Sequence, residues 1–114
     1  MIAVIFEVDI HPDRKDAYLE IAAALKASLE RVEGFISVER FQSLSSPEKL
    51  LSLSFFRDAE AVARWRNLPE HRAAQQKGRN GIFRGYRLRV AQVLRDYSMD
   101  ERTDAPDDSK TRLG

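Results

Sequence analysis

The sequence predicts an α+β fold, and three observations carry that prediction. Apolar and polar residues alternate with a period of two near the start of the chain and again in the segment that ends near residue 96, as in half-buried strands. Two further segments repeat apolar residues every three or four positions, as in amphipathic helices. Clusters of Gly, Pro and Ser separate these segments, so the predicted order is strand, helix, strand, strand, helix, strand.

The first strand is predicted over residues 2–10, and the first helix ends at Gly34. One face of this strand is entirely apolar and consists of Ile2, Val4, Phe6, Val8 and Ile10. The step His11-Pro12-Asp13 ends the strand, and Pro12 is tolerated near a helix start because its missing N–H would have no partner there. The helix then places apolar residues at spacings of three and four, which predicts one buried face.

The second and third strands are predicted over residues 35–44 and 49–57. The turn Ser45-Ser46-Pro47-Glu48 separates them, because these residue types favour turns. Asp58 is a good N-cap for a helix over residues 59–68. The sequence therefore predicts two strands followed directly by the second helix.

A further helical piece and a long strand are predicted next. Pro69 interrupts the second helix, so residues 69–77 form a separate helical piece. Glycines at 78 and 81 break the chain, and residues 84–96 then form the last strand. We expect this strand to complete the sheet.

This order of elements predicts the ferredoxin-like split βαβ fold, a four-stranded antiparallel sheet with two helices on one face. Residues 1–97 form this domain, and residues 98–114 form a polar tail without periodicity. Both sides of the strands carry apolar residues, for example Ile5 behind Phe6. Because an apolar sheet face is rarely left in water, we expect two copies of the chain to pair these faces as a homodimer.

Length and composition restrict the class of protein. The 114 residues fit one domain, and the formal net charge of +1 would steer the chain neither to nucleic acid nor to a membrane surface. The chain has no cysteine, which excludes disulfides and thiolate chemistry. Its start is typical of a strand rather than a signal peptide, and it has no apolar run of membrane-spanning length. We therefore expect a cytoplasmic protein with no nucleic-acid partner and no membrane partner.

Two residues are candidates for chemistry. Trp65 is the only tryptophan and lies on the apolar stripe of the second helix, where it either anchors the core or grips a planar ligand. His71 follows in the pattern Pro-Glu-His-Arg. Its imidazole titrates near neutral pH and suits proton transfer, and the alternative is a surface or capping role. The other histidine, His11, is predicted to be structural.

Other kinds of site are disfavoured. Two distant histidines and no cysteine give no recognised zinc-ligand spacing. The segment GRNGIFRG precedes a predicted strand rather than a helix, so it is not a phosphate-binding loop. The arginines of the last strand fit a solvated strand edge better than an RNA-binding surface.

The chain resembles the antibiotic biosynthesis monooxygenase (ABM) domain family, of the dimeric α+β barrel superfamily, in four stretches: IAVIFEVDI, RVEGFISVERF, LLSLSFFRDAEAVARWRNLPEHRAAQQKGR and IFRGYRLRVAQVLRDYSMDER. The resemblance spans residues 2–102. It implies a ferredoxin-like protomer and a homodimer whose sheets close into a barrel. It also implies oxidation of quinol-like or polycyclic aromatic small molecules by O₂, with no bound cofactor and no metal.

The hypothesis that follows is an ABM-type monooxygenase with His71 and Trp65 as its catalytic residues. His71 would accept the proton, and Trp65, which matches the helical tryptophan of haem-degrading members, would form a pocket wall. The predicted substrate-binding residues are Phe6, Phe83, Tyr86, Arg87 and Arg89. Haem-degrading members also need an Asn on the first strand, where this chain has Phe6 or Glu7. The alternative function is a non-catalytic dimer that binds a small molecule, haem included.

Overall fold

The computed structural model describes residues 1–113, and it contains one four-stranded antiparallel sheet. The strands are β1 (Ile2–Ile10), β2 (Phe35–Gln42), β3 (Lys49–Phe56) and β4 (Phe83–Gln92). Their order across the sheet is β2-β3-β1-β4. This is the ferredoxin-like arrangement that the alternating sequence pattern predicts, and the predicted fold class is confirmed.

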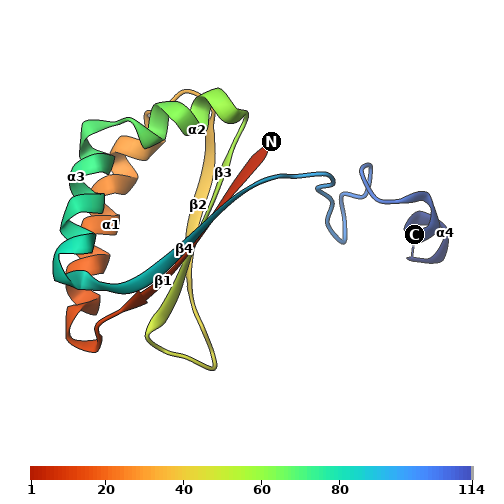
Figure 1. Cartoon of the computed structure of the whole chain (residues 1–114). Coiled ribbons are helices and arrows are strands. Elements are labelled where there is room, and N and C mark those ends of the chain that lie inside the picture. The colour runs from red at the N-terminus through yellow and green to blue at the C-terminus, as the bar shows by residue number, and fades with distance from the viewer. Residues whose placement is uncertain (114) are drawn as a thin grey trace.

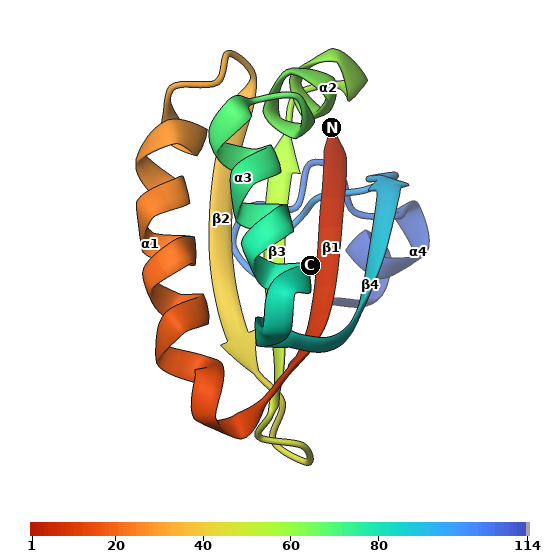
Figure 2. The same ribbon diagram turned by 60° about the vertical axis from the view of Figure 1, so that its left-hand side comes forward.

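Three helices cover one face of this sheet (Figure 1): α1 (Lys15–Glu30), α2 (Ala59–Arg66) and α3 (Pro69–Lys77). The 3-10 turn Pro12–Arg14 leads from β1 into α1. Asp58 caps α2, since its carboxylate accepts a hydrogen bond from the Ala61 backbone N–H at 2.9 Å. In Figure 2, β4 lies at one edge of the sheet with no helix in front of it. Most residues of β4 are exposed, unlike those of β1, so β4 is less covered than its neighbour.

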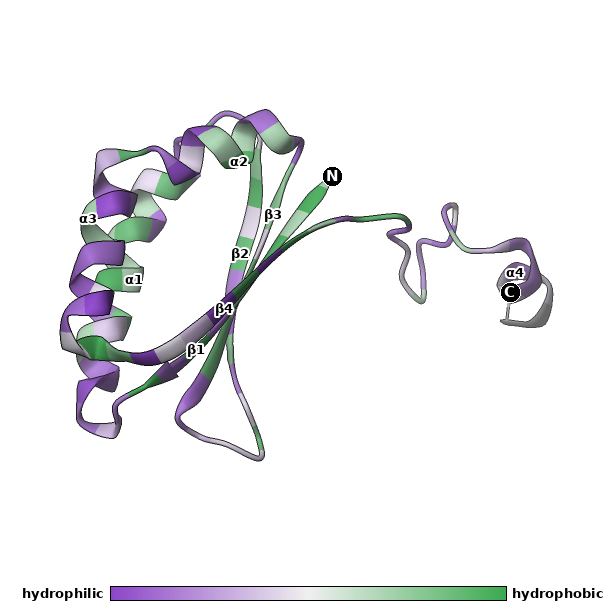
Figure 3. Ribbon diagram, in the orientation of Figure 1, coloured by the Kyte–Doolittle hydropathy of each residue, from purple (hydrophilic) through white to green (hydrophobic). Residues whose placement is uncertain are grey.

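The core between helices and sheet consists of two separate clusters. One cluster joins β1, β3 and α1 and contains Val8, Ile10, Tyr18, Ala22, Leu50 and Ile82. The other lies toward α2 and contains Val4, Leu29, Phe56, Ala61 and Val62. Figure 3 shows hydrophilic and hydrophobic residues alternating along α1 and α3, as expected for helices with one face on the sheet and one in water.

Two strands end earlier than the sequence predicts. β4 ends at Gln92, which pairs with Ile2 at the start of β1. Past this pair β1 offers β4 only the Met1 carbonyl, which accepts a hydrogen bond from the Val93 N–H. β2 ends at Gln42, opposite Leu50. In β4 the period-two pattern continues past the point where a partner strand is available, whereas β2 ends where the chain turns into β3. Pairing, not residue pattern, therefore sets the end of β4.

A π-helical segment, Gly78–Ile82, joins α3 to β4. A Cβ atom at Gly78 would lie 2.3 Å from the ring of Phe83, so only glycine allows this ring to pack against the helix end. Gly81 has a φ of +102°, a backbone conformation that residues other than glycine rarely adopt. The predicted chain break is therefore a compact turn that directs Phe83 inward.

The C-terminal segment extends away from the sheet on the side opposite the helices (Figure 1). It differs from the predicted tail in one respect, because it contains the helix α4 (Asp107–Leu113). Asp107 and Asp108 lie in its first turn, where acidic side chains favour a helix. Gly114, the last residue of the predicted tail, lies outside the described residues. Within residues 1–113, no helix combines the length and apolar character needed to cross a bilayer.

Candidate active site

A cavity of about 160 Å³ lies between the sheet and the helices. The pairing register builds its floor from two rows of side chains that run across the sheet: Val38, Ser54, Val4 and Val90 in one, and Arg40, Ser52, Phe6 and Leu88 in the other. The small Ser52 and Ser54 occupy the middle of this floor, and the other floor residues apart from Arg40 are apolar or aromatic. Because serine fills little volume, these two residues leave space between the sheet and the helices.

The walls of the cavity come from the helices. Ile21 and Leu25 of α1 supply one apolar wall, and Trp65 of α2 together with His71 and Gln75 of α3 supplies the other. The cavity borders both core clusters, since Tyr18 belongs to one and Val62 to the other. It therefore separates the two halves of the core.

His71 occupies the first turn of α3 and points into this cavity. Pro69 starts the helix after the extended Leu68, which places His71 beside Trp65 with ring centroids 4.1 Å apart. Only 8% of His71 is exposed. Burial, reinforced by the positive charge of Arg72, lowers the pKa of His71 from 6.5 to about 4. The imidazole is therefore neutral at pH 7 and able to accept a proton or a hydrogen bond.

Trp65 contacts both the core and the cavity. Its ring lies 5.6 Å from that of Phe56, which is itself 5.9 Å from Phe35. On its other side it contacts His71 and lines the cavity. Both interpretations offered by the sequence, core anchor and pocket wall, therefore describe this side chain.

Three predicted substrate-binding aromatics lie together at the β4 side of the cavity. Phe6 is 5.9 Å from Phe83 and 5.6 Å from Tyr86, measured between ring centroids. Tyr86 also accepts a hydrogen bond from Arg79, whose guanidinium lies 5.7 Å from the centroid of its ring. All three aromatics line the cavity, so the structure brings them into one site with Trp65 and His71.

The other two predicted substrate-binding residues, Arg87 and Arg89, do not line this cavity. They pair with Glu7 and Ile5 in the register between β4 and β1, which places them on the sheet face opposite the helices. Arg89 Nη1 lies 2.9 Å from Glu7 Oε2. Strand alternation explains the result, because Tyr86, Leu88 and Val90 occupy the helix side of β4.

Sequence reasoning missed Arg40, a cavity residue on β2. Its Nε is buried without a hydrogen-bond partner, and so is His71 Nδ1. Residues 1–113 hold three such atoms, and two of them belong to cavity-lining residues. Native proteins rarely leave buried polar atoms unpaired, so each of these two atoms is a candidate partner for a polar ligand group. The β2 sequence FISVERFQ has no clean alternation, which is why the pattern gave no signal.

The sequence profile of the antibiotic biosynthesis monooxygenase family matches residues 1–77. The chain belongs to this family. A protein of Pyricularia oryzae named jasmonate monooxygenase ABM is 46% identical over 101 residues, which cover 89% of this chain and 47% of that protein. The chain thus spans about half the length of this relative.

Two further proteins share the ABM-type sequence or fold. The uncharacterized protein YqjZ of Bacillus subtilis is 30% identical over 101 residues, 89% of this chain and 86% of its own length. The solved structure of Rv0793 from Mycobacterium tuberculosis matches with a TM-score of 0.77 at 20% identity, over 85% of this chain and 98% of that one. The second likeness shows a shared fold.

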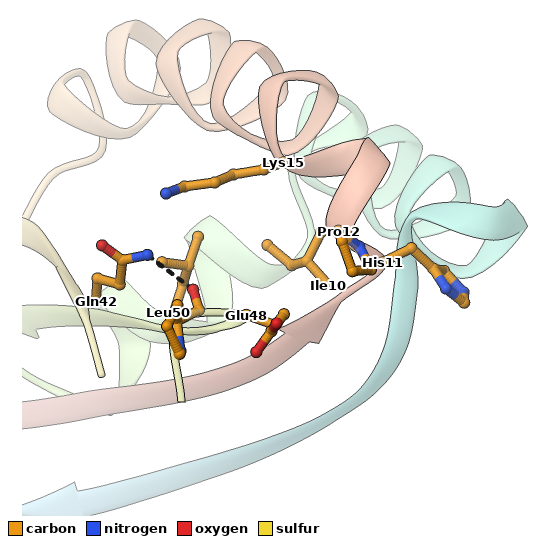
Figure 4. A pocket seen from close by; sticks show the side chains of 8 residues that line it. Ile10, His11, Pro12, Lys15, Gln42, Glu48 and Leu50 are labelled. Atoms are coloured by element: carbon orange, nitrogen blue, oxygen red, sulfur yellow. Dashed lines mark hydrogen bonds between the residues drawn. The ribbon is translucent and has the colours of Figure 1, made fainter. Parts of the chain in front are cut away.

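A second cavity of this ABM protein, about 200 Å³, lies at the junction of β1 and α1. Figure 4 shows Lys15 and Gln42 on one side of it and Glu48 on the other. Gln42 Nε2 already donates to the Pro47 carbonyl at 2.8 Å, and no buried unpaired polar atom faces it among the described residues. Within the same part of the chain, no three His, Cys, Asp or Glu side chains cluster as a metal site. The cavity beside His71 is therefore the candidate active site.

Proposed function

We propose that this protein is an ABM-type monooxygenase that oxidises a small cyclic molecule with O₂ in the cavity beside His71. The observation that carries the proposal is a neutral, buried imidazole with an unpaired Nδ1 inside a largely apolar cavity. Membership of the ABM family and the naming of a 46% identical relative as a monooxygenase support it. An apolar, water-poor site also suits reactive oxygen intermediates.

In the proposed reaction His71 accepts a proton from the substrate, and the resulting anion transfers electrons to O₂. The lowered pKa of His71 makes it a weak base. The arginines that line the cavity compensate for this, because they stabilise the anion that forms. Oxidation of a quinol to a hydroxyquinone releases four electrons, two from the quinol-to-quinone conversion and two from the ring C–H that becomes C–OH, and these reduce O₂ to the new hydroxyl oxygen and one water. The reaction therefore balances without an added reductant.

The size of the cavity favours a substrate with one ring. An engineered protein cavity of about 150 Å³ binds benzene, and this cavity is about 160 Å³. A quinol fits that volume, whereas a polycyclic aromatic would extend beyond it. Jasmonate, which appears in the name of the Pyricularia oryzae relative, is a second one-ring candidate. Hydroxylation of an alkyl C–H in such a molecule consumes two further electrons, so its assay needs an added reductant.

We also propose that two copies of the chain pair their uncovered sheet faces as a homodimer. Strand alternation places seven apolar side chains on that face: Ala3, Ile5, Phe41, Leu51, Leu53, Phe55 and Ala91. Six of these, all except Ala3, are partly or fully exposed in the single chain. Covering them with a second copy removes this apolar surface from water.

Oxygen uptake by metal-stripped protein tests the proposed activity. The panel contains hydroquinones, reduced polycyclic phenols and jasmonate, each with and without NADH as reductant. We expect saturable uptake with a one-ring substrate and at least a tenfold loss of turnover in His71→Ala, the order of magnitude expected for loss of a general base.

The matched control is His11→Ala, the same substitution at the histidine outside this cavity, and it should retain wild-type turnover. Equal losses in both variants, with both proteins folded by circular dichroism, would remove His71 as the base. Flat traces over the whole panel would contradict the enzymatic proposal and favour a binding protein of the same fold.

A further inference from the structure

The cationic side chains of the cavity have no anionic counterpart. Arg40, Arg66 and Arg79 line it, and no Asp or Glu is among its described lining residues. None of the three ion pairs formed within residues 1–113 involves these arginines. Arg66 and Arg79 are exposed, whereas Arg40 is half-buried, so Arg40 is the least exposed of the positive charges that line the cavity without a carboxylate partner.

The three arginines differ in how accessible they are to a ligand. Arg79 already donates a hydrogen bond to the Tyr86 hydroxyl, and Arg66 is exposed at the rim. Arg40 alone combines a place on the cavity floor, opposite Ser52, with a buried Nε that has no partner in the described chain. A buried donor without a partner loses its hydrogen bonds to water and gains none in return. Arg40 is thus the group that gains most from a ligand.

The neighbours of Arg40 favour an acceptor group. The Tyr18 phenol lies beside the guanidinium. Burial raises the pKa of Tyr18, while the charge of Arg40 and a hydrogen bond from its guanidinium to the phenol oxygen lower it by a smaller amount. At neutral pH the phenol therefore keeps its proton and can donate it in a hydrogen bond. The hydrogen-bond donors at this position are the guanidinium N–H groups of Arg40 and the phenol O–H of Tyr18. They suit a ligand group with two acceptor oxygens.

We infer that Arg40 anchors a carboxylate of a one-ring substrate on the cavity floor, and that this contact sets the substrate class of the protein. This inference rests on the proposed function for the identity of the site. A guanidinium binds a carboxylate through two parallel N–H···O bonds, a geometry that a single phenolic oxygen cannot use. A carboxylate is also ionised throughout the neutral range, whereas a simple phenol is not. The apolar body of the ligand then lies against Ile21, Leu25 and Leu88, toward His71 and Trp65.

Binding of two isosteric probes tests the inference without any turnover. The probes are 3-phenylpropionate and 3-phenylpropionamide, which share one ring and one chain and differ in charge. Titration calorimetry under nitrogen measures both dissociation constants. We expect the wild-type protein to bind the carboxylate at least tenfold more tightly than the amide.

Three variants assign the preference to Arg40. In Arg40→Gln the carboxylate should bind about 10- to 100-fold more weakly, as expected for loss of a charge-assisted pair, while amide binding stays within twofold of wild type. Arg40→Lys keeps the charge without the fork and should retain part of the preference, which guards against a folding defect in the first variant. Arg89→Gln, on the opposite sheet face, is the matched control and should bind like wild type.

Three outcomes would overturn the inference. The first is an unchanged carboxylate affinity in Arg40→Gln, the second is equal affinity of the wild type for both probes, and the third is no saturable binding of either probe. Carboxylate-selective binding without oxygen uptake would overturn the proposed function and leave this inference intact. Oxygen uptake without carboxylate selectivity would do the opposite.

Discussion

The two faces of the sheet place the same kinds of residue in different environments. On the helix-covered face, Arg40 keeps a buried Nε without a partner. On the uncovered face, Arg89 forms an ion pair with Glu7 at 2.9 Å. Successive side chains of a strand point to opposite faces, so adjacent residues such as Leu88 and Arg89 belong to different environments.

The two faces differ in whether a strand arginine has a carboxylate partner. On the uncovered face Arg89 pairs with Glu7 within the chain, beside apolar side chains that offer area for a partner. The covered face holds arginines without carboxylates and a histidine without a hydrogen-bond partner. The candidate ligand site therefore lies on the face where polar groups are buried and unsatisfied, not on the face where charged residues are most frequent.

The largest expected effect compares Phe56 with its neighbour Phe55. Phe56 is fully buried beneath Trp65, so Phe56→Ala should lower the free energy of unfolding by about 3–5 kcal/mol. Phe55 lies on the uncovered face and is partly exposed, so Phe55→Ala should cost about 1 kcal/mol in dilute solution. Urea unfolding at several protein concentrations measures both. A Phe55→Ala cost as large as that of Phe56→Ala at the lowest concentration would contradict the contrast between the faces.

The second effect concerns association through the uncovered face. Leu53 lies opposite Ile5 in the centre of this face, and Leu53→Asp would bury a charge in the proposed dimer. We expect the dimer dissociation constant to rise at least about 100-fold, which sedimentation velocity would detect as monomer. Leu44→Asp, at a residue fully exposed in the loop, is the control and should leave association unchanged. A monomeric wild-type protein would contradict the dimer.

The third effect is a pH dependence from His71 on the covered face. Its folded pKa of about 4 lies below the ordinary 6.5, so the unfolded state binds the proton more readily between these values. Stability should therefore fall as the pH drops from 6.5 toward 4, by about 2 kcal/mol. Chemical denaturation of wild type and His71→Gln across this range measures the difference. Parallel pH profiles for the two proteins would show that the imidazole is not buried as described.

The smallest effect concerns the charged pair of the uncovered face. Arg89 and Glu7 are both partly solvent-exposed, and such pairs contribute about 0–1 kcal/mol. Arg89→Gln should therefore change stability by less than about 1 kcal/mol and leave ligand binding unaltered. Thermal unfolding and the calorimetric titration check the two statements. A larger loss would show that the uncovered face depends on this pair.

The sequence predicted the fold because its signals are local. Alternation in residues 2–10, the helical spacing before Gly34 and the cap at Asp58 each depend on neighbours within a few positions. Trp65 was indicated by its place on the apolar stripe of the second helix and His71 by the chemistry of its imidazole, and the structure places the two in contact. The early end of β4 and the helix α4 were not predicted, since the first depends on where β1 begins and the second lies in a polar segment without periodicity.

By itself the sequence determined the order of elements, the two apolar strand faces and the residue types available for chemistry. Only the tertiary structure decided which side chains share the cavity. In that structure Arg87 and Arg89 lie on the uncovered face, and Arg40 of β2 lines the same cavity as residues of α2 and α3, which are distant in the chain. The physical reason is that strand register fixes the face of every side chain at once, and register depends on pairing between segments that no local pattern encodes.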